Sequence, residues 1–176
     1  MMRTSLAPPA PPAWPIARPG LLMTKVGVVS FIHISSALDE EGERVHAEEL
    51  ARMIDARPVD VRVAVVYDVP QSMGISALGR SGIAKLLNER EEKLARTTAA
   101  YALATPSAFV RGMLQAVFWI APPPYPHRMV ASMVEALDFI ALHLPHVSPA
   151  RALAEYEATL AQHEAVVKPG RSLETR

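Results

Sequence analysis

The sequence contains no cysteine and has no excess of either charge: Lys and Arg together number 18, as do Asp and Glu. Without cysteine the chain cannot form disulfides, thiolate nucleophiles or cysteine-based zinc sites, a composition typical of a cytoplasmic protein. The balanced charge gives no strongly basic surface to attract nucleic acid. No stretch reaches the roughly 18 consecutive apolar residues of a membrane-spanning helix, so we expect a protein that is not transmembrane.

Motifs that indicate catalysis are also scarce. His143 and His146 are separated by a proline that breaks a helix, so they form no metal-binding pair on one helix face. A catalytic Ser-His-Asp triad could be assembled from Ser72, His127 and Asp68 by residue type alone. No G-x-S-x-G motif surrounds the serine, so the sequence does not support it. The sequence therefore predicts no catalytic residue, metal site or cofactor, and a protein that is not an enzyme.

Prolines are frequent, and they cluster at the N-terminus. Residues 1–23 contain six of the 16 prolines, which oppose both helix and sheet. We expect a disordered arm over 1–23, of which residues 1–22 are dispensable for folding, and no signal peptide, because the prolines interrupt every apolar stretch. Met23 is a plausible alternative start to Met1.

The remainder alternates between strand-like and helix-like patterns. Strands are predicted at 25–34, 61–69, 97–105 and 127–131, and helices at 43–56, 76–95, 106–120, 132–144 and 149–166. This order predicts an α/β fold with a small, mostly parallel four-stranded sheet flanked by helices, with right-handed crossovers. We expect this domain over 24–146, an extra C-terminal helix over 147–168 and a tail over 169–176.

Several segments resemble one family. The stretches "RVAVVYDV", "PSAFVRGMLQAVFWIAPPPYPHRMV" and "MVEALDFI" resemble the STAS/SpoIIAA-like group of small bacterial α/β proteins. The resemblance implies a regulatory module that acts through protein partners, some members of the group switching partners when one serine is phosphorylated. The matching turn here is "MGISALG", with Ile75 at the phosphoacceptor position and Gly74 in place of the preceding aspartate. Ser72 and Ser76 remain candidates for a switch, while Ser76 equally suits the N-cap of the following helix.

Asp68 is the strongest single carboxylate. It ends the strand 61–69, and the carboxyl ends of parallel strands commonly carry ligands and catalytic groups. Alternatively, it accepts hydrogen bonds from the amides of the turn 71–74 and has a structural role. We favour the structural role for Asp68. If that role is wrong, we expect Asp68, Ser72 and Ser76 to form either a switch or a ligand-binding turn.

The helix over 106–120 has more apolar side chains than one core-facing side needs. We expect the surplus near Trp119, and we predict that Arg111, Gln115 and Trp119 bind a protein partner or form a homodimer. A stripe of Leu153, Tyr156 and Leu160 could assist from the last helix. The alternative is that the last helix or the proline-rich arm covers this surface within the chain.

Two functions follow from these patterns. The first is a non-catalytic, cytoplasmic protein-interaction module. The second is a carrier or sensor of a small apolar ligand or lipid, since methionine-rich helices can line a pocket. A deep apolar pocket beside the helix 106–120 would favour the carrier.

Overall fold

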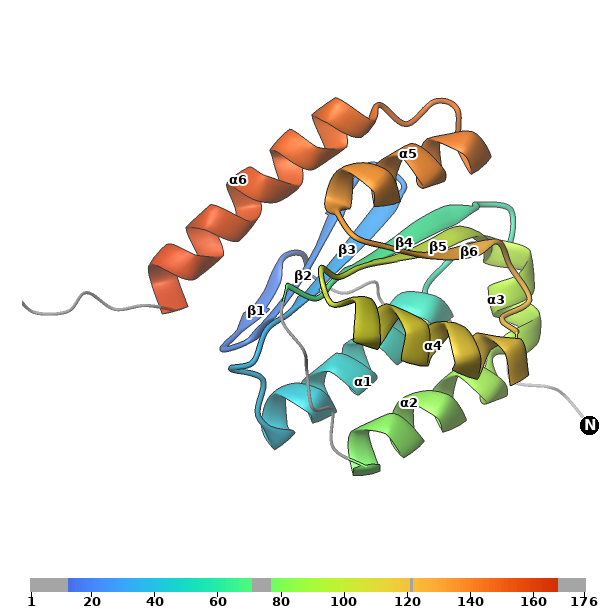
Figure 1. Ribbon diagram of the computed structural model, residues 1–176, viewed down its shortest axis with the longest axis horizontal. Helices are drawn as coiled ribbons and strands as arrows, with labels where there is room; N and C mark the ends of the chain where they lie inside the picture. The colour runs from blue at the N-terminus through green and yellow to red at the C-terminus, as the bar shows by residue number, and fades with distance from the viewer. Residues whose placement is uncertain (1–12, 71–76, 121, 168–176) are drawn as a thin grey trace, which may run out of the picture.

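A computed structural model describes residues 13–70, 77–120 and 122–167 and shows a six-stranded mixed sheet with helices on both faces (Figure 1). The strands lie in sequence order across the sheet. β1 pairs with β2 and β2 with β3 in antiparallel fashion, whereas β3 to β6 are parallel. The strands are β1 (Ile16–Arg18), β2 (Leu21–Val26), β3 (Val29–Ile34), β4 (Val63–Asp68), β5 (Thr98–Ala104) and β6 (His127–Val130).

The α/β class and the four parallel strands agree with the prediction, but the sheet is larger and mixed. The boundary of the N-terminal arm at residue 23 is wrong, because Leu21 and Met23 are fully buried in β2 and β1 begins at residue 16. Residues 1–12 lie outside the described part of the chain. The predicted strand 25–34 is also wrong as a single unit: Gly27, at φ +58°, makes the tight turn between β2 and β3.

The helices divide unequally between the two faces. In Figure 1, α1 to α4 lie on one face and α5 and α6 on the other. Each crossover from β3 onward advances by one strand in the same direction, so right-handed connections place all of the crossover helices together. The helices are α1 (Glu40–Asp55), α2 (Ala77–Glu89), α3 (Glu91–Thr97), α4 (Ala108–Ile120), α5 (Met133–His143) and α6 (Pro149–Val167).

Helix ends follow local hydrogen bonding. The Asp39 carboxylate accepts from the Gly42 amide at 2.8 Å and caps α1, which therefore begins earlier than the periodicity predicts. Ser132 caps α5 as expected and accepts from the Glu135 amide at 3.3 Å. The predicted helix 76–95 is divided at Arg90 into α2 and α3.

Each sheet face has its own apolar core. Alanines of β5 lie opposite α5, where their small side chains allow the helix to approach the sheet closely. The other face buries larger side chains of β2 and β3, including Ile32, against Leu50 and Ile54 of α1. Alternate residues of each strand serve the two faces.

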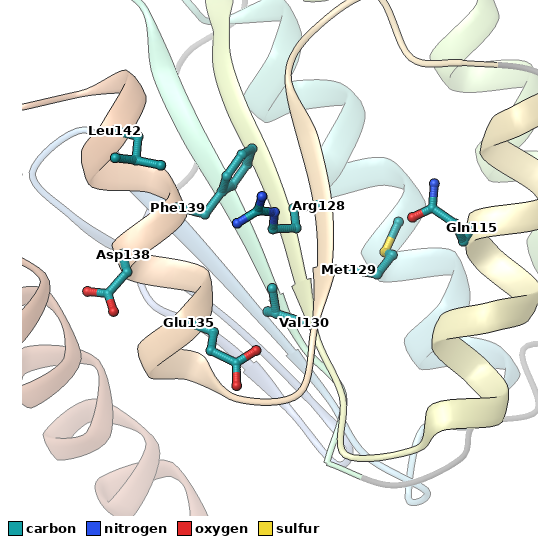
Figure 2. A pocket seen from close by; sticks show the side chains of 8 residues that line it. All are labelled: Gln115, Arg128, Met129, Val130, Glu135, Asp138, Phe139 and Leu142. Carbon is teal, nitrogen blue, oxygen red and sulfur yellow. The ribbon is translucent and has the colours of Figure 1, made fainter.

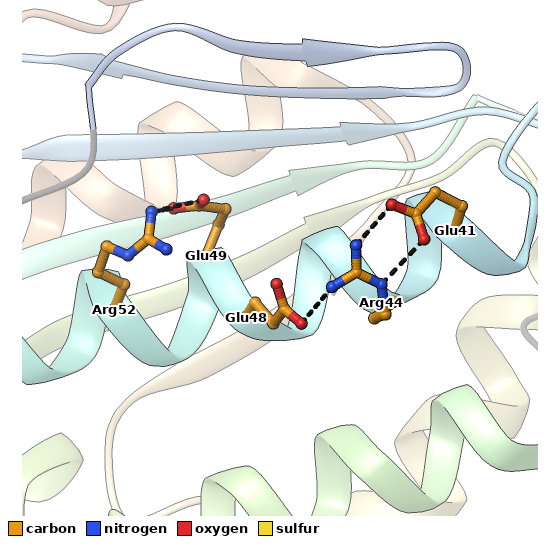
Figure 3. A network of polar contacts seen from close by, with 5 residues as sticks. All are labelled: Glu41, Arg44, Glu48, Glu49 and Arg52. Carbon is orange, nitrogen blue, oxygen red and sulfur yellow. Dashed lines mark hydrogen bonds and ion pairs between the residues drawn. The ribbon is translucent and has the colours of Figure 1, made fainter.

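The outer face of α1 carries short-range ion pairs (Figure 3). Arg44 contacts both Glu41 and Glu48, and Arg52 Nη1 donates to Glu49 Oε1 at 2.6 Å. The Arg44 pairs are exposed, so this face of α1 stays in contact with water and the pairs contribute little to stability. None of the helices in the described part of the chain is long and apolar enough to cross a membrane.

Candidate functional site

A cluster of polar side chains lies at the carboxyl ends of β3 and β4. His33 pairs with Asp68 across the two strands, and its Nδ1 lies 2.9 Å from Asp68 Oδ2. The Tyr156 hydroxyl of α6 donates to the same carboxylate oxygen at 2.5 Å. Burial and then the Asp68 carboxylate raise the pKa of Tyr156 well above its usual value, so the phenol remains a donor.

His163 lies next to this cluster. It is 7% exposed, and its Nδ1 has no hydrogen-bond partner among the described residues. Burial lowers the pKa of His163, and the proximity of His33 lowers it further. His163 of α6 therefore lies close to His33 of β3, and among the described residues only His33 of this pair is hydrogen-bonded to a carboxylate, that of Asp68.

The role predicted for Asp68 is only partly tested. Its described partners come from β3 and α6, which sequence reasoning did not consider. The turn amides proposed as donors, and both candidate switch residues Ser72 and Ser76, lie outside the described residues. The described part of α2 begins at Ala77.

The cluster contains the groups of an acid–base dyad, since an aspartate that orients a histidine can prepare its second nitrogen to accept a proton. A substrate would need access to that nitrogen. His33 is buried, and it lines neither of the two hollows described below. The geometry therefore fits a junction that fastens α6 to the sheet.

A second polar cluster occupies the opposite face. His46 Nε2 lies 2.9 Å from the Tyr67 hydroxyl, and burial lowers the pKa of His46 to about 4. Arg57 is buried nearby; one of its nitrogens lies 3.3 Å from Thr98 Oγ1, and Nη2 has no partner among the described residues. Burial lowers the pKa of Arg57 to about 10. His46 and Arg57 are both buried, so they form part of a polar interior.

A groove of about 630 Å³ lies along β6, the last strand of the sheet. Figure 2 shows β6 between Gln115 of α4 on one side and Phe139 of α5 on the other. The Arg128 guanidinium lies 5.1 Å from the centre of the Phe139 ring. The remaining lining residues are Met129, Val130, Glu135, Asp138 and Leu142. Polar and apolar groups alternate around this groove.

The three residues predicted as a partner-binding site have different surroundings in the structure. Trp119 is 78% exposed, as the surplus of apolar residues on this helix predicts. Gln115 precedes it by one turn and lines the groove. The side chain of Arg111 reaches back to the N-terminal end of α4, where its Nη1 donates to the Thr105 carbonyl at 2.6 Å. Arg111 thus ties α4 to the segment that precedes it, while the Ser107 hydroxyl caps the helix by accepting from the Val110 amide.

The stripe predicted to assist partner binding is wrong. Tyr156 stacks on Phe31 with ring centres 4.7 Å apart, and Leu153 and Leu160 pack against the same core. The hollow of about 250 Å³ between α5 and α6 is small, and the larger groove has charged walls. Neither is the enclosed apolar chamber expected of a lipid carrier.

No family model, curated protein or solved structure matches this chain. The resemblance to STAS/SpoIIAA-like proteins therefore stays a prediction, as does the absence of catalysis. Within the described residues, no group of three or more acidic or histidine side chains is arranged to hold a metal ion.

Proposed function

We propose that this protein is a non-catalytic protein-interaction module that pairs with a second copy of itself along the free edge of β6. The single observation that carries the proposal is the position of this strand. β6 is the last strand of the sheet, and the exposed Leu142 of α5 lines the groove along it; the exposed Trp119 follows Gln115, which lines the opposite wall, by one turn of α4. The resemblance to STAS domains, which act through protein partners, favours the same class of function.

An edge strand offers backbone groups that another strand can pair with. The inner edge of β6 is bonded to β5 from Tyr101 to Ala104, which leaves its outer edge free in the sheet as described. Antiparallel pairing of two β6 strands about a two-fold axis would use the same four residues from each copy. The two sheets would then continue into one another.

Charges along the groove suit a two-fold arrangement. Arg128 forms no ion pair within the described part of the chain, and it lines the groove together with Glu135 and Asp138. A two-fold axis at β6 would bring Arg128 of each copy towards the acidic side chains on α5 of the other. The chain as a whole has zero formal charge, so two copies do not repel each other.

The size of the exposed surface is compatible with pairing. A tryptophan can bury about 150–250 Å², and Leu142 is 73% exposed beside the same strand. Two copies of Trp119 would contribute about 300–500 Å² of the roughly 1,200–2,000 Å² of a standard interface, and Leu142, the groove walls and their neighbours would have to supply the rest.

Sedimentation velocity of the full chain over a range of concentrations tests the proposal. We expect the wild type to form dimers and both Trp119→Ala and Leu142→Asp to shift the protein towards monomer. Arg128→Glu should weaken dimers about tenfold or more, and the double variant Arg128→Glu with Asp138→Arg should restore them by exchanging the charges.

Val59→Ala is the matched control. Val59 is also an exposed apolar side chain, but it belongs to the loop between α1 and β4, outside the groove. Its variant should dimerise like the wild type. A wild type that remains monomeric at about 100 μM, or dimers insensitive to all of the β6-edge variants, would contradict the proposal.

A further inference from the structure

The last helix covers the sheet and encloses the two histidines described above. α6 packs against α5 and β2, and Tyr156 is 1% exposed. His163 follows Tyr156 by seven residues, which places both side chains on the same helix face. A helix that contacts the rest of its domain through one buried face is the kind of element that can open separately.

The groups around His163 can be named element by element. β3 contributes His33, and Asp68 of β4 lies behind it, bonded to both His33 and Tyr156. α6 itself contributes Glu164, whose charge raises the pKa of His163 by less than burial lowers it. The buried residues of β2 on this side, Leu22 and Thr24, carry no group that titrates near neutral pH. The titratable side chains of α5 are exposed, namely Glu135, Asp138 and His143.

We propose that α6 is an acid-sensitive cover: as the pH falls below neutral, His163 gains a proton and α6 lifts from β2 while the rest of the sheet remains folded. The docked helix leaves the protonated imidazole without an acceptor for Nδ1, and His33 is its close neighbour. A lifted helix exposes the same imidazole to water, where its charge is solvated. Lifting also uncovers the apolar face that contains Phe31.

The direction of the pH dependence follows from proton binding. The docked pKa of His163 lies below the value of about 6.5 for a free imidazole, so the lifted form binds more protons. Docking is therefore complete above about pH 6.5 and weakens as the pH falls further. Binding of one proton to His163 changes the equilibrium between docked and lifted α6 by up to about tenfold per pH unit.

Hydrogen–deuterium exchange of the full chain tests this proposal. Peptides from 149–167 should exchange up to about tenfold faster at about pH 5.5 than at about pH 7.5, after correction for chemical exchange. Peptides from β4 should remain protected in both conditions. His163→Leu should remove the pH dependence in α6, whereas His146→Gln, which changes an exposed histidine, should retain it.

Tyr156→Phe provides a second test if the His163 variant does not fold. It keeps the ring on Phe31 and removes only the hydroxyl that donates to Asp68. Exchange in α6 should be faster at both pH values, with the acid response preserved. The proposal is overturned if β4 opens in parallel with α6, if α6 exchange does not respond to pH, if a folded His163→Leu retains the response, or if Tyr156→Phe exchanges like the wild type.

Discussion

At the scale of single residues, Asp68 joins three elements through one oxygen atom. The same Oδ2 receives the Tyr156 hydroxyl and lies against His33 Nδ1. Asp68→Asn removes the charge from both contacts, and an amide cannot serve both neighbours equally well. We expect the free energy of unfolding to fall by about 1–3 kcal/mol in urea titrations followed by circular dichroism.

Asp60→Asn is the control for that measurement, because Asp60 is an exposed carboxylate in the loop before β4. It should change stability by less than about 0.5 kcal/mol. Equal effects of the two substitutions would show that the bonds to Asp68 contribute nothing to stability.

The sequence could identify Asp68 but not its partners. The strand-end position is visible in the local pattern, whereas His33 and Tyr156 are 35 and 88 residues away along the chain. A histidine within the apolar stretch "VSFIHI" was the available signal, since a buried imidazole needs a polar neighbour. Trp119 was easier to predict, because an excess of apolar residues on one helix is a local property.

At the scale of elements, α1 shows that one cap on a buried backbone amide can outweigh several exposed ion pairs. Asp39→Ala leaves the Gly42 amide without its partner at the start of α1 and should cost about 1 kcal/mol. Arg44→Ala removes contacts to two glutamates but should lower stability less than the loss of the cap, because the three side chains are exposed. Urea titrations of both variants provide the comparison, and a larger loss for Arg44→Ala would contradict this ranking.

Elements with strong local signals were predicted within a few residues. β4 is a continuous apolar run, and α5 starts at the expected serine cap. The first two strands were missed for different reasons: β1 spans only three residues beside prolines, and the turn at Gly27 interrupts what looks like one apolar strand. The division of α2 from α3 at Arg90 also had no clear signal, since charged residues surround it.

At the scale of the whole molecule, the N-terminal hairpin is part of the domain. A chain that begins at Thr24 lacks β1 and the buried side chains of Leu21, Leu22 and Met23. Losing a buried side chain of this size lowers the free energy of unfolding by about 2–5 kcal/mol. Three such losses are therefore comparable with the total stability of a domain. We expect this shortened chain to lose its cooperative thermal transition in circular dichroism.

A chain that begins at Ala13 is the matched control, because it retains every described residue. It should melt cooperatively, within a few degrees of the full chain. A Thr24 chain that melts at the same temperature as the Ala13 chain would show that the hairpin is dispensable.

The sequential order of the strands has a consequence for synthesis on the ribosome. Each new strand adds beside the one made just before it, so the sheet can grow from its first hairpin without waiting for distant segments. α6 is the exception, since Tyr156 must reach back to a carboxylate 88 residues earlier. The nascent chain can therefore complete its sheet while the face containing Phe31 is still open, and that face closes only when the last helix leaves the exit tunnel.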